Sequence, residues 1–110
     1  MKIIITASNE DINQPFNLRF GRADTFLLFD SNSKEWSTLA NPASHSSGGA
    51  GPQAVEFISH KGVDVVVSGR FGPKAVSALQ AAGVKAYTAL TGTVSEVLEQ
   101  YLNGQLKQVG

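Results

Sequence analysis

Three arginines and one histidine stand beside glycines in the sequence, and these side chains have the chemistry to bind a ligand. Arg19, Arg22 and Arg70 carry planar guanidinium groups, which bind carboxylate or phosphate oxygens through paired hydrogen bonds. His45 stands in a Ser/Gly-rich stretch, where a neutral imidazole can ligate a metal ion or an iron atom of a cluster. These residue types favour a site for an anion or for an anionic metal cluster.

Each of these side chains also has a purely structural interpretation. A salt bridge from Arg22 to Asp24 or to Asp30 would stiffen the turn that contains them. For Arg19, a solvated side chain is the favoured interpretation. His45 has no second metal ligand nearby in the sequence, and a solvated loop histidine fits the same pattern.

Glycines and aromatic residues next to the arginines leave similar alternatives open. Residues 48–52 can cradle an anion with backbone N–H groups, or they can simply reverse the chain before a helix. Phe20 and Phe71 either line a pocket or pack in the core. Trp36 is interpreted as a packing residue at the centre of a strand.

The first half of the sequence predicts strands separated by loops. Residues 2–7 form a β-branched run that is typical of a buried strand. Residues 25–30 and 35–40 flank a polar turn and are predicted to pair as an antiparallel hairpin. Residues 41–51 predict a long loop, and such loops often carry function in compact domains.

The second half alternates helices with strands. Two buried strands are predicted at residues 63–68 and 84–87, and the tail after residue 104 is predicted to be loosely held. Three helices are predicted, each beginning at a proline or a capping threonine and ending at a glycine: Pro52 to Gly62, Pro73 to Gly83, and Thr93 to Gly104 with a capping box at Glu96.

These connections make the strands parallel, so the helices after them begin at the carboxyl edge of the sheet. Open α/β sheets bind ligands at this edge, where helix N–H groups favour negative charge. His60, Lys61 and Lys85 are expected at the opposite edge or on helix faces. The predicted binding residues at the carboxyl edge are Arg22, Asn41, His45, Gly49, Gly51, Ser68, Arg70 and Gly72, with His45 as the metal ligand.

Composition limits the classes of function. The 110 residues, of which 42% are hydrophobic, fit one domain spanning residues 1–110. Nine basic and nine acidic residues cancel, which argues against nucleic acid as a partner. No apolar run reaches the length of a membrane span, and the first residues resemble a strand rather than a signal peptide, so we expect a cytoplasmic protein. Without cysteine, the chain offers no disulfide and no thiolate ligand.

Three segments together resemble the dinitrogenase iron-molybdenum cofactor biosynthesis family: residues 19–26, Asn41-Pro42 followed by residues 48–54, and residues 62–73. The resemblance implies a three-layer ribonuclease H-like α/β fold, with helices on both faces of a mixed five-stranded sheet in the order 3-2-1-4-5 and strand 2 antiparallel. Nitrogenase-linked members often have His-Phe-Gly-His where this chain has Arg-Phe-Gly-Arg at residues 19–22. The chain is therefore more similar to the small stand-alone members.

The resemblance implies a non-catalytic carrier of an anionic metal cluster, of the iron-sulfur or iron-molybdenum cofactor type, that works with cofactor-assembly proteins. A ribonuclease H-like nuclease would need clustered carboxylates, usually with one on the first strand, and residues 2–7 contain none. No Ser/His/Asp or Cys/His arrangement is apparent either, so we expect no enzymatic activity. The alternative is a metal-free module on the same fold that binds a small anion or a partner protein.

Overall fold

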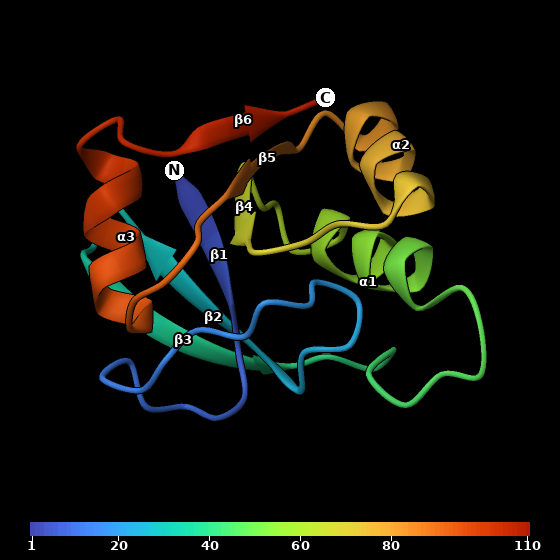
Figure 1. Ribbon diagram of the computed structural model, residues 1–110, viewed down its shortest axis with the longest axis horizontal. Helices are drawn as coiled ribbons and strands as arrows, with labels where there is room; N and C mark the ends of the chain where they lie inside the picture. The colour runs from blue at the N-terminus through green and yellow to red at the C-terminus, as the bar shows by residue number, and fades with distance from the viewer.

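The computed structural model describes residues 1–110 and contains a mixed sheet of six strands in the order β3-β2-β1-β4-β5-β6 (Figure 1). The central strand β1 (Lys2–Ala7) pairs antiparallel with β2 (Thr25–Asp30) and parallel with β4 (Val65–Ser68). β4 in turn pairs parallel with β5 (Lys85–Thr88). The carboxyl ends of β1, β4 and β5 therefore share one edge of the sheet.

The predicted hairpin is confirmed. β2 pairs antiparallel with β3 (Glu35–Ala40), with Thr25 opposite Ala40 at the open end. Lys34 closes the turn in a left-handed backbone conformation, at φ 61°. Because β2 runs against β1, the chain leaves β3 at the carboxyl edge and enters the loop at residues 41–49 there.

Helices cover both faces of the sheet (Figure 1). α1 (Ala50–Ser59) and α2 (Pro73–Ala82) pack on one face, and α3 (Val94–Leu102) packs on the other. Side chains of β1 alternate between the two cores, since Ile4 belongs to the core under α1 and α2 and its isoleucine neighbours belong to the core under α3. None of the three helices has the length and apolarity that a membrane crossing requires.

The predicted ends of the second and third helices agree closely with the structure. α2 begins at Pro73 and stops at Gly83, which adopts the left-handed conformation at φ 73°. The capping box of α3 is present, because the Thr93 hydroxyl accepts the Glu96 N–H at 3.1 Å and the Glu96 carboxylate accepts the Thr93 N–H at 2.9 Å.

The ends of α1 differ from the prediction. The helix begins at Ala50, because Gly49 adopts a left-handed conformation at φ 66° and turns the chain into the helix earlier than expected. Pro52 is then the third helical residue, a position whose N–H has no acceptor within the helix, so a proline fits there. The helix stops at Ser59, with His60 as its C-cap, rather than at Gly62.

Five strands and a loosely held tail were predicted, and both expectations are wrong. β6 (Lys107–Val109) pairs antiparallel with β5 and adds a sixth strand at the edge of the sheet. Val109 packs against the core under α1 and α2. A three-residue strand with one inward apolar side chain is too short for the alternating pattern to be recognised in the sequence.

Candidate functional site

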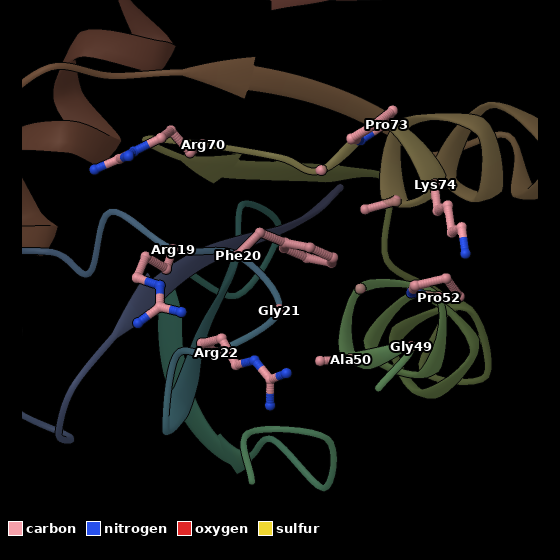
Figure 2. A pocket seen from close by; sticks show the side chains of 13 residues that line it. Arg19, Phe20, Gly21, Arg22, Gly49, Ala50, Pro52, Arg70, Pro73 and Lys74 are labelled. Carbon is pink, nitrogen blue, oxygen red and sulfur yellow. The ribbon is translucent and has the colours of Figure 1, made fainter. Parts of the chain in front are cut away.

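A cavity of about 460 Å³ opens at the carboxyl edge of the sheet, between the segment at residues 19–22 and the starts of α1 and α2 (Figure 2). We call it the edge cavity. Of the predicted site residues, it brings together Arg22, Gly49, Gly51, Arg70 and Gly72. Its complete lining consists of residues 19–22, residues 49–52, Arg70, and residues 72–75.

Four cationic side chains and no carboxylate line the edge cavity. The cations are Arg19, Arg22, Arg70 and Lys74, and none of them forms a salt bridge, since the one carboxylate contact of a basic side chain lies elsewhere, between His45 and Asp24. The chain as a whole has no net charge. A local excess of uncompensated positive charge therefore distinguishes this cavity and favours anions.

Both helices that border the edge cavity begin there without a side-chain cap. Gly49 precedes α1 and Gly72 precedes α2, and neither residue has a side chain that can accept an N–H from the first turn. The first N–H groups of each helix have no acceptor within the helix and add partial positive charge. α3 satisfies its own first turn with a capping box, so uncapped helix starts are a feature of the edge cavity.

Two glycines allow the three walls of the edge cavity to touch. A Cβ atom on Gly21 would lie 2.9 Å from the backbone nitrogen of Gly51. A Cβ atom on Gly51 would lie 2.9 Å from the Cβ of Ala75 in α2. Gly21 was missed by the sequence analysis, because a close approach between segments 30 residues apart has no local pattern.

Phe20 combines the two roles that the sequence left open for the aromatic residues. Its ring lines the edge cavity, yet the residue is only 1% exposed and belongs to the core under α1 and α2. Its centroid lies 5.9 Å from that of Phe26 and 5.2 Å from that of Phe71. Phe71 packs against the same core without lining the cavity, and Trp36 packs against Phe29 on the other face, as expected.

Arg22 binds main-chain carbonyl groups. Its Nη1 donates to the carbonyl oxygen of Ser44 at 3.4 Å and to that of Ser46, both in the loop at residues 41–49. The salt bridge to Asp24 or Asp30 that sequence proximity suggested is not formed. Asp30 lies at the opposite edge, where its carboxylate accepts the N–H of Asn32 at 2.9 Å, and this hydrogen bond lowers the pKa of the carboxyl group.

Asn41 lies beneath the edge cavity and joins the segment at residues 19–24 to the loop. The side chain is 4% exposed, and its Nδ2 donates to the carbonyl oxygens of Gly21 at 3.0 Å and Ala23 at 2.9 Å. Its Oδ1 accepts the N–H of Ala43 at 3.0 Å. Asn41 does not line the cavity, so the geometry favours a supporting role over ligand contact.

Replacement of Asn41 by alanine is expected to lower the free energy of unfolding by about 2 to 4 kcal/mol, because it leaves partners of the amide without hydrogen bonds in a buried place. Urea denaturation measures this change. Ser47→Ala, at an exposed residue of the same loop, is the control and is expected to shift the free energy by less than about 0.5 kcal/mol. A loss that is equally small for both variants would contradict the supporting role.

Ser68 is also buried under the site rather than exposed in it. Its hydroxyl accepts a hydrogen bond from Thr6 Oγ1 at 2.8 Å and donates to the carbonyl oxygen of Asn17 at 3.4 Å. These bonds connect the ends of β4 and β1 to the segment that carries Arg19 and Arg22. Ser68 thus helps to hold the start of that segment against the ends of β1 and β4.

His45 lies on the loop and does not line the edge cavity. Its side chain is 92% exposed, and its Nε2 lies 3.9 Å from Oδ1 of Asp24. No group of three or more histidine, cysteine or carboxylate side chains is arranged to hold a metal ion. The loop nevertheless brings His45 near the cavity wall, because the carbonyl groups on either side of it, from Ser44 and Ser46, bind Arg22.

Lys74 is a cation of the edge cavity that the sequence analysis missed. It directly follows Pro73, and the predicted helix start at the carboxyl edge was the signal that could have identified it. Figure 2 shows Lys74 on the first turn of α2 and the Arg22 side chain extending toward the start of α1, whereas Arg19 and Arg70 extend away from the two helix starts. The cations therefore lie on two sides of the cavity.

Arg19 and Arg70 stand side by side in a short parallel bridge. The Arg70 N–H donates to the carbonyl oxygen of Leu18 at 2.7 Å, and the Phe20 N–H donates to that of Arg70 at 3.1 Å. Both arginine side chains are exposed, and neither has a carboxylate partner. The bridge holds the two backbones in register, so two cationic side chains leave neighbouring points on this wall of the cavity.

Comparisons with known proteins support the resemblance. Residues 1–104 match the model of a family described as dinitrogenase iron-molybdenum cofactor. The structure is similar to the apo form of the orange protein from Desulfovibrio gigas, with 34% identity, a TM-score of 0.93, and coverage of 99% of this chain and 92% of that chain. A candidate NifB protein from Thermotoga has 30% identity and a TM-score of 0.86, with coverage of 97% and 91%. An uncharacterised protein from Methanocaldococcus jannaschii is 26% identical over 98% of this chain and 91% of its own length.

Proposed function

Because the chain belongs to the dinitrogenase iron-molybdenum cofactor family, we propose that it is a non-catalytic carrier that binds an anionic metal cluster in the edge cavity. One observation carries the proposal: four cationic side chains line this cavity without a single carboxylate to neutralise them. Guanidinium, ammonium and free helix N–H groups all bind negative charge, and none of them bonds directly to a metal ion.

The lining determines how a cluster would be held. It contains no thiol, imidazole or carboxylate, so the metal atoms of the cargo would keep the ligands with which they arrive. The protein would contribute charge-assisted hydrogen bonds to the outer sulfide or oxide ligands of the cluster. Such binding is reversible and weakens with salt, which suits a protein that must release its cargo.

The same lining supports a carrier rather than a catalyst. Carboxylate, imidazole, thiol and hydroxyl groups often perform proton transfer and nucleophilic attack, and none of these lines the edge cavity. The one amine in the lining, Lys74, is exposed and has no acid or base beside it in the lining. We propose that the protein acts in the cytoplasm and exchanges its cargo with cofactor-assembly proteins. The names of its relatives agree with this role, since the family is described by the iron-molybdenum cofactor and one structure as the apo form of the orange protein.

Anaerobic reconstitution tests the proposal. The chain is purified without oxygen, incubated with iron and sulfide, with and without molybdate, and freed of excess reagents by gel filtration. We expect about one cluster per chain, measured as iron, molybdenum and sulfide, together with a visible absorption spectrum. Retention should fall as the salt concentration rises, because the binding groups are cations at the surface.

The alternative function is a metal-free module for small anions, which the absence of any metal-ligating side chain from the lining also fits. A chain that stays colourless after reconstitution but binds phosphate or molybdate in calorimetry would support this alternative. A chain that binds neither would contradict both functions. His45→Ala tests, in the same assay, the metal ligand that the sequence predicts, and unchanged retention of the cluster would remove this exposed histidine from the site.

A further inference from the structure

We infer that Arg22 is a positioning residue: its hydrogen bonds to the loop at residues 41–49, which we call the latch, hold this loop in place. An anion bound in the edge cavity strengthens the latch. The inference rests on the proposed anion site and assigns to Arg22 a role that its residue type alone does not suggest. An arginine in a cationic cavity is expected to donate its hydrogen bonds to the ligand. Here part of the guanidinium is already bound to the protein.

The loop is fixed at both ends. At its start, the Asn41 N–H donates to the carbonyl oxygen of Asp24 at 3.0 Å, and the Asn41 amide binds the carbonyl groups of Gly21 and Ala23. At its end, Gly49 turns directly into α1. The first residues of α1 line the edge cavity, so the conformation of the loop determines how this helix start is presented.

Arg22 holds the middle of the loop. Two short turns, closed by the Ser44 N–H to Asn41 at 3.3 Å and by the Ser46 N–H to Ala43 at 3.0 Å, form its backbone. The carbonyl groups of Ser44 and Ser46 both bind Nη1 of Arg22. One nitrogen atom from the opposite wall of the cavity therefore connects two points of the loop.

The remaining N–H donors of Arg22 couple a bound anion to the loop. A guanidinium group carries five N–H donors in a rigid planar fork, and the loop occupies only Nη1. Arg22 also lines the edge cavity, and Figure 2 shows its side chain extending on the side of the α1 start. An anion that accepts from Nε or Nη2 would immobilise the fork and, through Nη1, the loop.

Lys74 provides a matched control. It lines the same cavity and carries the same charge, but it stands on the exposed first turn of α2 and its ammonium group forms no salt bridge. Removal of Lys74 therefore takes one charge from the site without touching the loop. Removal of Arg22 takes the same charge and the latch together.

Hydrogen exchange of residues 42–48, followed by mass spectrometry, tests the inference in wild type, Arg22→Gln, Arg22→Lys and Lys74→Gln. Without added anion, we expect the loop of Arg22→Gln to exchange about tenfold faster or more than that of wild type, since hydrogen bonds from a charged donor are lost. Lys74→Gln should match wild type. Saturating molybdate should slow exchange in wild type and Lys74→Gln but not in Arg22→Gln.

Arg22→Lys separates charge from geometry. Lysine restores the point charge but not the planar fork, so it should recover part of the molybdate affinity in calorimetry without anion-dependent protection of the loop. If the loop exchanged hydrogen at the wild-type rate in both Arg22→Gln and Arg22→Lys, the latch would be overturned. Equal protection by molybdate in wild type and both Arg22 variants would overturn the coupling. If molybdate fails to bind the wild type, the anion site and the coupling fall together, and the comparison without anion still decides the latch.

Discussion

Replacement of Arg19, Arg70 and Lys74 together by glutamine is expected to weaken molybdate binding about a hundredfold or more. All three residues line the edge cavity and none has a carboxylate partner, so their removal leaves no carboxylate unpaired. A charge-assisted hydrogen bond contributes roughly 1.5 to 3 kcal/mol, and each 1.4 kcal/mol changes affinity about tenfold. Two such bonds lost from the site suffice for the expected change, which isothermal titration calorimetry at fixed salt measures.

The matched control replaces Lys34, Lys61 and Lys85 by glutamine. These exposed lysines lie at the opposite edge, in the β2–β3 turn, just before β4 and at the start of β5, so the net charge changes equally while the cavity stays intact. Their fields are largely screened beyond about 10 Å at 0.1 M salt, and affinity should change by less than about twofold. An equal loss in both triple variants would mean that net charge, rather than the edge cavity, governs binding.

Replacement of Phe20 by alanine is expected to cost about 3 to 5 kcal/mol of unfolding free energy, a large part of the roughly 5 to 15 kcal/mol that stabilises a typical domain. The Phe20 ring is 1% exposed and packs between Phe26 and Phe71. Its loss leaves a void in the core directly behind the cavity wall. Urea denaturation monitored by circular dichroism measures the change.

Two further variants serve as comparisons for the stability loss expected of Phe20→Ala. Phe20→Leu keeps most of the buried apolar volume and should cost clearly less than alanine. Leu90→Ala removes an apolar side chain that is 91% exposed and should change stability by less than about 0.5 kcal/mol. A Phe20→Ala protein as stable as Leu90→Ala would show that the ring only lines the cavity and does not support the core.

Chain direction was the part of the fold that the sequence predicted best. The isoleucine run at residues 3–5 identified the central strand, and Pro73, Gly83 and Thr93 marked helix ends that the structure reproduces. Parallel strands joined by helices then determined which loops share an edge. Three arginines were thereby expected at the edge where the cavity lies, without any knowledge of side-chain contacts.

Hydrogen bonds from side chains to main-chain carbonyl groups could not be predicted from the sequence. Arg22 binds carbonyl groups that every residue possesses, so no residue type 22 or 24 positions away signals the partner. The burial of Asn41 and Ser68 could not be predicted either, because both residues lie at the predicted edge but their side chains face inward. Both side chains satisfy backbone or hydroxyl groups there, and only the folded path of residues 17–24 shows which ones.

The bridge between Arg19 and Arg70 links the proposed cargo to the stability of the folded chain. Both arginines are exposed and have no carboxylate partner, so an anion that binds them displaces no ion pair. A ligand at a hundred times its Kd stabilises the folded state by about 2.7 kcal/mol. Proteases degrade chains that unfold transiently, so under the proposed function empty molecules would be degraded faster than loaded ones.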